Sequence, residues 1–367
     1  MLYHHDSRGY EEAASDAANH ARQKLEGLIA QGRDRAGHVI DMVEKEVPSD
    51  YVIRAKKLHY DTDGADLLMS FKDQNNKEVV TGMHPHAVEQ VAKLCGLPKK
   101  WVNEKLVGDD WERELLTHTF NEIFNHREQR QLVRVVNEET RGIMSDKFRR
   151  IDSRPIIESF ANACSTYGAV PVEGYYLQTK VAIKALLPMV FEPVPNEIIA
   201  YGVVLQNSDY GLGTYSLRKI LLRLWCTNYA IAEEMLRQVH LGKRLPDNIS
   251  FSEKTHLLDT ETMVSATTDI MEEAFNPNSV NALINAVKEA HETEISPTRI
   301  KEFLKAKLNK EETKQVTDAF MSPDVVNMPP GQSKLRLSNA ISWIAGKTDN
   351  GQRKLEMQQI AGKLIAA

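Results

Sequence analysis

The sequence has few cysteines and lacks any long apolar run. Its three cysteines, Cys95, Cys164 and Cys226, lie far apart in a chain of 367 residues. They form neither the close pairs typical of a zinc site nor an even disulfide set, so we expect a protein of a reducing cytoplasm without a bound metal. No stretch approaches the roughly 20 apolar residues that a membrane helix needs, so we expect no membrane association.

The sequence also lacks an overall excess of positive charge. It contains 46 basic and 51 acidic residues, which gives a formal net charge of -5. This excludes a globally basic nucleic-acid binder, but basic residues outnumber acidic ones between residues 127 and 244. A locally basic centre is typical of a phosphate-binding surface, although ordinary scatter of surface charge also explains it.

The periodicity of apolar residues divides the chain into three parts. Residues 1–48 have the spacing of an N-terminal helical segment. Residues 49–250 alternate between apolar and polar positions over short runs bounded by turns, which predicts strands with interspersed helices. Residues 251–367 have helical spacing throughout. We therefore expect an α+β protein in which a central antiparallel β-sheet with packed helices lies between helical N-terminal and C-terminal regions.

The chain contains no complete enzyme motif. Residues 346–348, GKT, resemble the end of a phosphate-binding loop but lack its earlier glycine. Residues 181–184, VAIK, match the lysine strand of protein kinases without the other kinase motifs, which indicates a strand with one outward lysine. Asp269, Glu272 and Glu273 share one face of a predicted helix and are candidate magnesium ligands of a nuclease, but a solvated acidic face is the simpler interpretation. We expect no catalysis and no cofactor.

A first arginine-rich segment lies in the basic centre. Its candidate nucleic-acid-binding residues are Arg134, Arg141, Lys147, Phe148, Arg149 and Arg150. Guanidinium groups bind phosphate oxygens through paired hydrogen bonds, and an aromatic ring stacks on a base. This combination is typical of a groove for single-stranded nucleic acid. The alternative is that the arginines form ion pairs with the acidic residues nearby, which are Glu138, Glu139, Asp146 and Asp152.

A second arginine-rich segment follows in the same part of the chain. Its candidate binding residues are Tyr210, Arg218, Lys219, Arg223 and Tyr229. A strand predicted over residues 213–222 places Arg218 and Lys219 on opposite faces of the sheet. We expect a helix over residues 229–239, with Thr227 or Asn228 as its N-cap. Capping is therefore a structural alternative to a binding role at these two positions.

The same two segments resemble a family of phage and plasmid proteins. Residues 141–152, RGIMSDKFRRID, are similar to the signature Arg-x-x-x-Ser-Asp-x-Tyr-x-x-Ile-Asp of the phage/plasmid-like family catalogued as domain of unknown function 932. Residues 202–211, 222–228 and 240–242 resemble later segments of that family in the same order. The resemblance extends over about residues 82–366 and implies a phage, prophage or plasmid origin, and hence the cytoplasm of a bacterial host cell.

The chain departs from the family pattern at two aromatic positions. Phe148 stands where the family often has Tyr, and Tyr229 where it often has Gly. Neither change removes a positive charge. A weaker, fold-level similarity relates the predicted hairpin, helix and strands to phage single-strand annealing proteins, which line a positive groove and assemble into oligomers.

Two functions are consistent with these features. The first is a phage-type, non-catalytic protein that binds single-stranded DNA, promotes annealing in recombination or replication, and forms homo-oligomers. The second is a phage structural or protein-interaction factor with no nucleic-acid binding, in which the central arginines form internal ion pairs. The first requires the cations of both segments to meet in one solvent-open trough.

Overall fold

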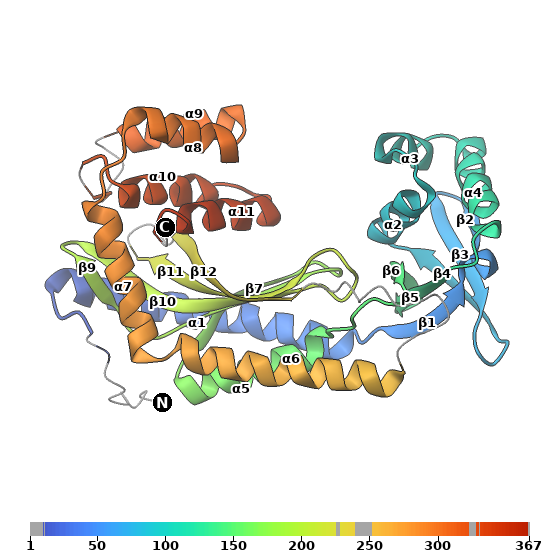
Figure 1. The fold of residues 1–367 in the computed structure, drawn as a ribbon, viewed down its shortest axis with the longest axis horizontal. Coiled ribbons are helices and arrows are strands. Elements are labelled where there is room, and N and C mark those ends of the chain that lie inside the picture. The colour runs from blue at the N-terminus through green and yellow to red at the C-terminus, as the bar shows by residue number, and fades with distance from the viewer. Residues whose placement is uncertain are drawn as a thin grey trace.

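A computed structural model describes residues 10, 12–224, 228–238, 252–322, 328–329 and 331–365. The chain forms two lobes that meet at one junction (Figure 1). The fold is α+β with helices at both ends of the chain, as expected. The strands form two separate sheets, whereas the sequence suggested a single central one. None of the described helices is both long enough and apolar enough to cross a membrane.

The small lobe contains residues 49–145 and the first sheet. Its strands are β1 (Ser49–Arg54), β2 (His59–Asp63), β3 (Asp66–Lys72), β4 (Glu78–Met83), β5 (Arg130–Val136) and β6 (Glu139–Ser145), in the spatial order β1-β5-β6-β4-β3-β2. Neighbours are antiparallel except β4 and β6, which pair in parallel. A short 3-10 helix, η1 (Ala55–Lys57), follows β1.

Three helices cover one face of this sheet: α2 (Pro85–Cys95), α3 (Lys99–Leu106) and α4 (Asp110–Asn125) (Figure 1). Side chains of a strand alternate between the two faces, and in β3 this alternation buries Leu67, Met69 and Phe71. These residues share one apolar core with Phe120 and Phe124 of α4. The small lobe therefore has a core of its own.

The large lobe contains the second sheet. Its strands are β7 (Val170–Tyr176), β8 (Val181–Leu186), β9 (Phe191–Val194), β10 (Glu197–Asn207), β11 (Tyr215–Arg223) and β12 (Asn228–Gln238). The order is β12-β11-β10-β8-β7, β9 pairs with β10, and every pair is antiparallel. Because β10 and β11 are long and central, most of their side chains are buried.

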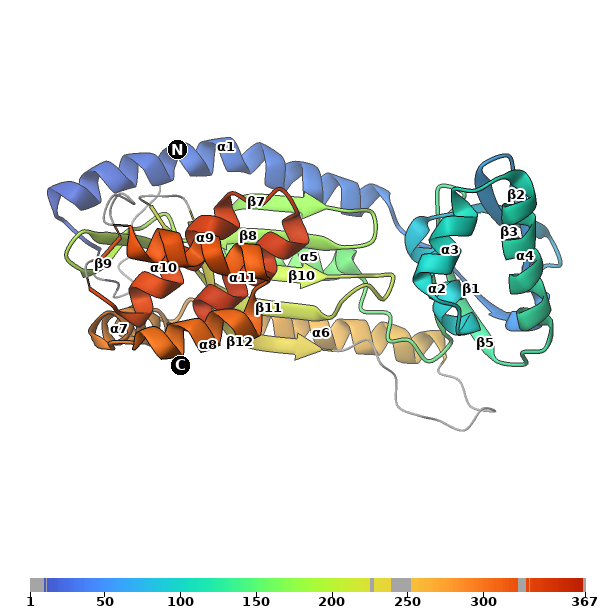
Figure 2. The same cartoon turned by 90° about the horizontal axis from the view of Figure 1, so that it is seen from above.

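Helices from both ends of the chain surround the second sheet. They are α1 (Asp16–Lys45), α5 (Ser153–Tyr167), α6 (Glu253–Ala274), α7 (Pro277–Glu292), α8 (Pro297–Lys307), α9 (Lys310–Met321), α10 (Lys334–Gly346) and α11 (Gly351–Gly362). Helices α5 and α6 lie under the sheet, α8 to α11 lie above it, and α1 runs beside edge strand β7 (Figures 1 and 2). The expected middle part, residues 49–250, is thus divided between the two lobes.

The prediction of a helix over residues 229–239 is wrong, because this stretch forms strand β12 up to Gln238. Its Ala, Glu, Met and Leu residues favour a helix locally, but pairing with β11, including Ile231 opposite Ile220, outweighs that preference. Asn228 begins the strand and so does not cap a helix. Thr227, Cys226 and the family-like residues 240–242 lie outside the described part of the chain.

Helix α1 lies close against the backbone of strand β7 at Gly32. A Cβ atom at this position would lie 1.8 Å from the carbonyl oxygen of Val172. We expect Gly32→Ala to lower the free energy of unfolding by about 1–3 kcal/mol, because the helix must move away from the strand. Gly37→Ala, on the same helix with no atom within 4 Å, is the control. It should raise stability by about 0.5–1 kcal/mol, since Ala is the better helix former. Chemical denaturation compares the two variants, and equal effects would contradict the close contact.

Candidate functional site

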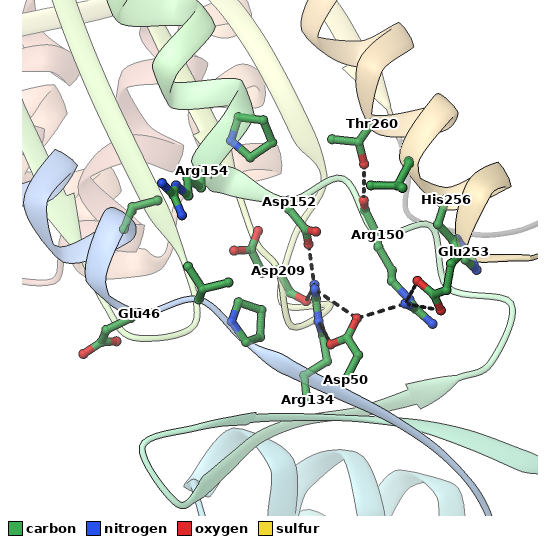
Figure 3. Close-up of a pocket in the computed structure, with 15 residues that line it drawn as sticks. Glu46, Asp50, Arg134, Arg150, Asp152, Arg154, Asp209, Glu253, His256 and Thr260 are labelled. Carbon is green, nitrogen blue, oxygen red and sulfur yellow. Dashed lines mark hydrogen bonds and ion pairs between the residues drawn. The ribbon is translucent and has the colours of Figure 1, made fainter. Parts of the chain in front are cut away.

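A charged pocket of about 270 Å³ lies where the two lobes meet (Figure 3). The end of α1, strands β1 and β5, and the first turns of α5 and α6 contribute side chains to it. Its charged lining residues are Glu46, Asp50, Arg134, Arg150, Asp152, Arg154, Asp209, Glu253 and His256. Residues far apart in the sequence, from the end of α1 to the start of α6, therefore converge on the junction, but none of the candidate residues of the second arginine-rich segment lines this pocket.

Arg134 of β5 connects the two lobes. Its Nε donates to Asp50 at 2.7 Å, its Nη2 to Asp152 at 2.6 Å, and its Nη1 to the carbonyl oxygen of Asp209 at 2.9 Å (Figure 3). The side chain is 1% exposed. Burial alone would lower the pKa of Arg134, but Asp152 and Asp50 outweigh it and raise the pKa above its ordinary value. Arg134 is therefore a structural link between the lobes and is closed to a phosphate.

Asp209 anchors the first turn of α5 at the same junction. Its Oδ1 accepts hydrogen bonds from the main-chain nitrogen of Ser153 at 2.9 Å and from the Ser153 hydroxyl at 2.6 Å. Asn207 adds a third bond at 3.2 Å. Burial and the neighbouring Asp152 raise the pKa of Asp209 to about 7. The turn that follows β10 and contains Asp209 thus joins β10 to α5.

Arg141 and Lys147 of the first segment do not form an open surface. Arg141 is buried and pairs with Glu46 of α1 and with Glu139. It also donates to the hydroxyl of Tyr176 at 3.2 Å. Lys147 is partly buried. Arg141 is consequently a second link between the lobes, because β6 belongs to the small lobe and α1 to the large one.

Arg149 and Arg150 bind carboxylates of α6. The Nε of Arg149 donates to Asp259 at 2.8 Å. Arg150 is buried and pairs with Glu253 at 3.0 Å and with Asp50 at 3.2 Å (Figure 3). Ion pairs of this kind are the alternative that the sequence left open for the first segment.

The three aromatic residues expected to stack on bases are buried. Phe148 is 8% exposed, Tyr210 is 3% exposed and Tyr229 is 8% exposed. The Tyr229 ring lies 3.9 Å from the Nζ of Lys184, a buried cation–π contact. A base can stack only on an exposed ring. The expectation of stacking at these residues does not fit the structure, because all three are packed in the interior.

The three cations of β11 lie in different environments. Arg218 and Lys219 are on opposite faces of the sheet, as the strand predicts. Lys219 is buried, whereas Arg218 is partly exposed and donates to the side-chain oxygen of Gln206 at 2.8 Å. Arg223, at the end of β11 away from the junction, is 5% exposed and pairs with the buried Glu197 at 2.7 Å.

The eight expected cations therefore do not form one solvent-open trough. Arg134, Arg141, Arg149, Arg150 and Arg223 are held by carboxylates, and they are distributed from the junction to the far end of the second sheet. Lys147, Arg149 and Arg218 are each partly exposed. Of these three, Arg218 lies on the face of the second sheet over which α10 and α11 pack.

Sequence analysis missed a smaller group of cations around Arg218. The strand register places Lys184, Val204 and Arg218 side by side across β8, β10 and β11. In the next row, the Tyr175 hydroxyl accepts a hydrogen bond from Gln206 at 3.3 Å. The lysine of the VAIK sequence lies on a strand, as expected, but is buried against Glu173 and not outward. The alternation of side chains along β8, β10 and β11 was the sequence signal that could have placed Lys184 and Arg218 on the same face of the sheet.

The exposed half of this face carries four partly exposed side chains. They are Tyr175, Lys180, Arg218 and Lys354, and we call them the open face. Of the described helices, α10 and α11 lie over one half of the sheet, and none lies over the half next to the small lobe (Figures 1 and 2). The open face is therefore the accessible part of this surface.

The open face holds two neighbouring cations. Burial lowers the pKa of Lys180, and the nearby Arg218 lowers it further, although Glu356 acts in the opposite direction. Among the described residues, the Nζ of Lys180 makes no hydrogen bond or ion pair. Two adjacent cations that repel each other are stabilised by an anion that contacts both. This arrangement suits a phosphate group.

The described residues contain no group of three or more His, Cys, Asp or Glu side chains arranged to hold a metal ion. Asp269, Glu272 and Glu273 are exposed on α6, and Glu273 accepts a hydrogen bond from Ser279 at 2.6 Å. These three carboxylates therefore lie on a solvated helix face.

Comparison with known proteins adds no relative. No family model, no curated protein and no solved structure matches this chain. The resemblance of the two arginine-rich segments to the phage/plasmid-like family thus stays an expectation from sequence.

Proposed function

We propose that this protein binds single-stranded nucleic acid, without catalysis, on the open face of the second sheet. This surface is not the trough that the sequence predicted, because most of the cations expected there are held by carboxylates. The observation that carries the proposal is the pair of cations Lys180 and Arg218, close enough that Arg218 lowers the pKa of Lys180, on the half of a sheet face over which none of the described helices lies. Tyr175 provides an aromatic ring beside them, and Lys354 adds a further cation from α11. Cations that follow a sugar–phosphate backbone, together with aromatic rings for the bases, are the common design of such surfaces.

The chemistry of the open face favours a single strand over a duplex. The bases of a single strand are unpaired and can lie on the ring of Tyr175, whereas a duplex hides the faces of its bases. A strand held through its phosphates keeps its base edges available for pairing. Annealing of complementary strands during recombination or replication of a phage or plasmid is the role that we propose on this basis.

A second candidate is a structural or protein-interaction factor with no nucleic-acid binding. The observation that favours it is the pairing of Arg134, Arg141, Arg149, Arg150 and Arg223 with carboxylates. If the protein is an interaction factor, we expect the central arginines to form internal ion pairs. The two candidates differ in whether the purified protein retains an oligonucleotide at low salt.

We expect the double variant Lys180→Gln/Arg218→Gln to bind a labelled oligo(dT) at least about tenfold more weakly than the native chain. Because single-strand binding loses about 0.7 log units of affinity per log unit of salt for each phosphate contact, the salt slope should fall by about 1.4. Lys77→Gln removes one positive charge from an exposed turn of the small lobe and serves as the control for a loss of charge elsewhere on the chain.

Fluorescence anisotropy at several salt concentrations measures both quantities. Equal affinities for the native chain, the double variant and the control would exclude the open face as the site. If the native chain shows no binding at low salt, the interaction-factor alternative is favoured instead.

A further inference from the structure

The junction between the two lobes is held by ion pairs and hydrogen bonds and by a small contact of Tyr210 and Gly211 with Gly142 and Met144. None of the described apolar clusters contains residues from both sheets, so each lobe buries its own core. The lobes are linked by the ion pairs of Arg134 with Asp152 and of Arg141 with Glu46. Domain interfaces that are small and polar permit relative motion, whereas large apolar ones do not. Opening this junction would rehydrate charged groups and uncover Tyr210, while the main apolar clusters of the two lobes stay buried.

Within the part of the chain that the structure describes, the backbone crosses the junction at two places. The small lobe is one continuous segment, so residues 46–49 and 146–152 are its covalent connections to the large lobe. Both connections end at the pocket, at the start of β1 and at the start of α5 (Figure 3). Two adjacent connections of this kind form a hinge, because a rotation about them leaves both sheets intact.

The small lobe also contacts the loop that borders the open face. In α2, His86 and Gln90 donate to the carbonyl oxygen of Tyr210 at 2.9 and 2.8 Å. The same loop continues to Gly213, where a Cβ atom would lie 3.8 Å from the side chain of Lys180. A movement of the small lobe is therefore transmitted to the edge of the open face through one short loop.

We propose that the small lobe is a hinged clamp that swings about residues 46–49 and 146–152 and so opens and closes the junction end of the open face. Nucleic acid enters and leaves while the clamp is open, and the ion pairs of Arg134 and Arg141 hold it closed. The part of this proposal that concerns binding rests on the function proposed above. The hinge itself does not depend on it.

A disulfide across the junction tests the clamp. A Cβ atom at Gly142 of the small lobe would lie 3.2 Å from the Cβ of Tyr210 in the large lobe, close to the spacing of about 3.5–4.5 Å in disulfides. The variant Gly142→Cys/Tyr210→Cys, with the native cysteines replaced by serine or alanine, can therefore be studied in two forms. In the oxidised form the disulfide holds the two lobes together, and in the reduced form it does not. We expect the oxidised form to associate with oligo(dT) at least about tenfold more slowly than the same protein after reduction.

A distance measurement follows the hinge without nucleic acid. Fluorophores on Glu122→Cys in α4 and Glu289→Cys in α7 report the separation of the lobes, since both sites are exposed. We expect a broad distance distribution in the cysteine-replaced chain and a broader one after Arg134→Met. The distance distribution of the cysteine-replaced chain should become narrower when the oxidised junction disulfide is added.

The possible results separate the two proposals. A narrow distribution that Arg134→Met leaves unchanged would overturn the hinge. A distribution that narrows on oxidation, with no change in the association rate, would overturn the role of the clamp in binding. If neither redox form binds oligo(dT), the proposed function fails, and the distance distribution alone decides whether the lobes move.

Discussion

Arg134→Met is expected to lower the free energy of unfolding by about 3–5 kcal/mol. The substitution leaves the carboxylates of Asp50 and Asp152 without the cation that lies 2.7 and 2.6 Å from them. Removal of one partner from a buried ion pair costs about this much, because the remaining charge stays desolvated. Urea denaturation at neutral pH, compared with the native chain, measures the loss.

Two further variants show whether the loss comes from buried charge. Arg154→Gln changes an arginine of the same pocket whose side chain is exposed and pairs with Glu158 one helical turn away, so its effect should stay within about 1 kcal/mol. Adding Asp152→Asn to Arg134→Met should recover part of the stability, because it removes a carboxylate that has lost its ion-pair partner, whereas Asp50 still pairs with Arg150. An Arg134→Met variant as stable as Arg154→Gln would show that the junction does not depend on this network.

Arg223→Met is expected to destabilise the chain by about 3–5 kcal/mol at neutral pH. It leaves Glu197, which is 3% exposed, without its partner at 2.7 Å. Burial already raises the pKa of Glu197, and Arg223 opposes that rise. In the variant the pKa of Glu197 therefore rises further above the value of an unfolded glutamate. Denaturation of the variant and the native chain at neutral pH measures the difference.

The loss caused by Arg223→Met should depend on pH in a defined direction. A carboxyl whose pKa is raised on folding favours the protonated folded chain, so its contribution to stability is present at low pH and is lost as pH rises through the raised pKa. The deficit of the variant should therefore shrink on acidification. Adding Glu197→Gln should abolish this pH dependence. A deficit that is the same at pH 5 and pH 8 would contradict a charged, buried Glu197.

Local patterns predicted the fold class but not the number of sheets. Alternation along β5 and the helical spacing of the two flanks identify strands and helices, because both depend on neighbouring residues. The division into two sheets depends on distant pairings such as Ser49 opposite Val135, which no local pattern reveals. Strand β12 shows the same limit, since its composition favours a helix and its partner β11 determines the outcome.

The candidate site was predictable only where partners are close in sequence. Nearness in sequence predicts Asp152 and Glu139 as ion-pair partners of the first segment, and they do bind Arg134 and Arg141. The other partners come from remote elements and could not be found from spacing. They include Asp50, Glu46, Glu253 and Asp259. The opposite orientations of Arg218 and Lys219 followed directly from strand alternation.

Photo-crosslinking to a bromouracil-substituted oligonucleotide is the most direct test of where a strand binds. The cross-linked peptides can be identified by mass spectrometry after digestion. We predict that they contain Tyr175 or lie next to Lys180, in the β7–β8 hairpin, and that 1 M salt abolishes them. Cross-links confined to exposed rings elsewhere, such as Trp111 of α4, or the absence of any cross-link at low salt, would contradict binding on the open face.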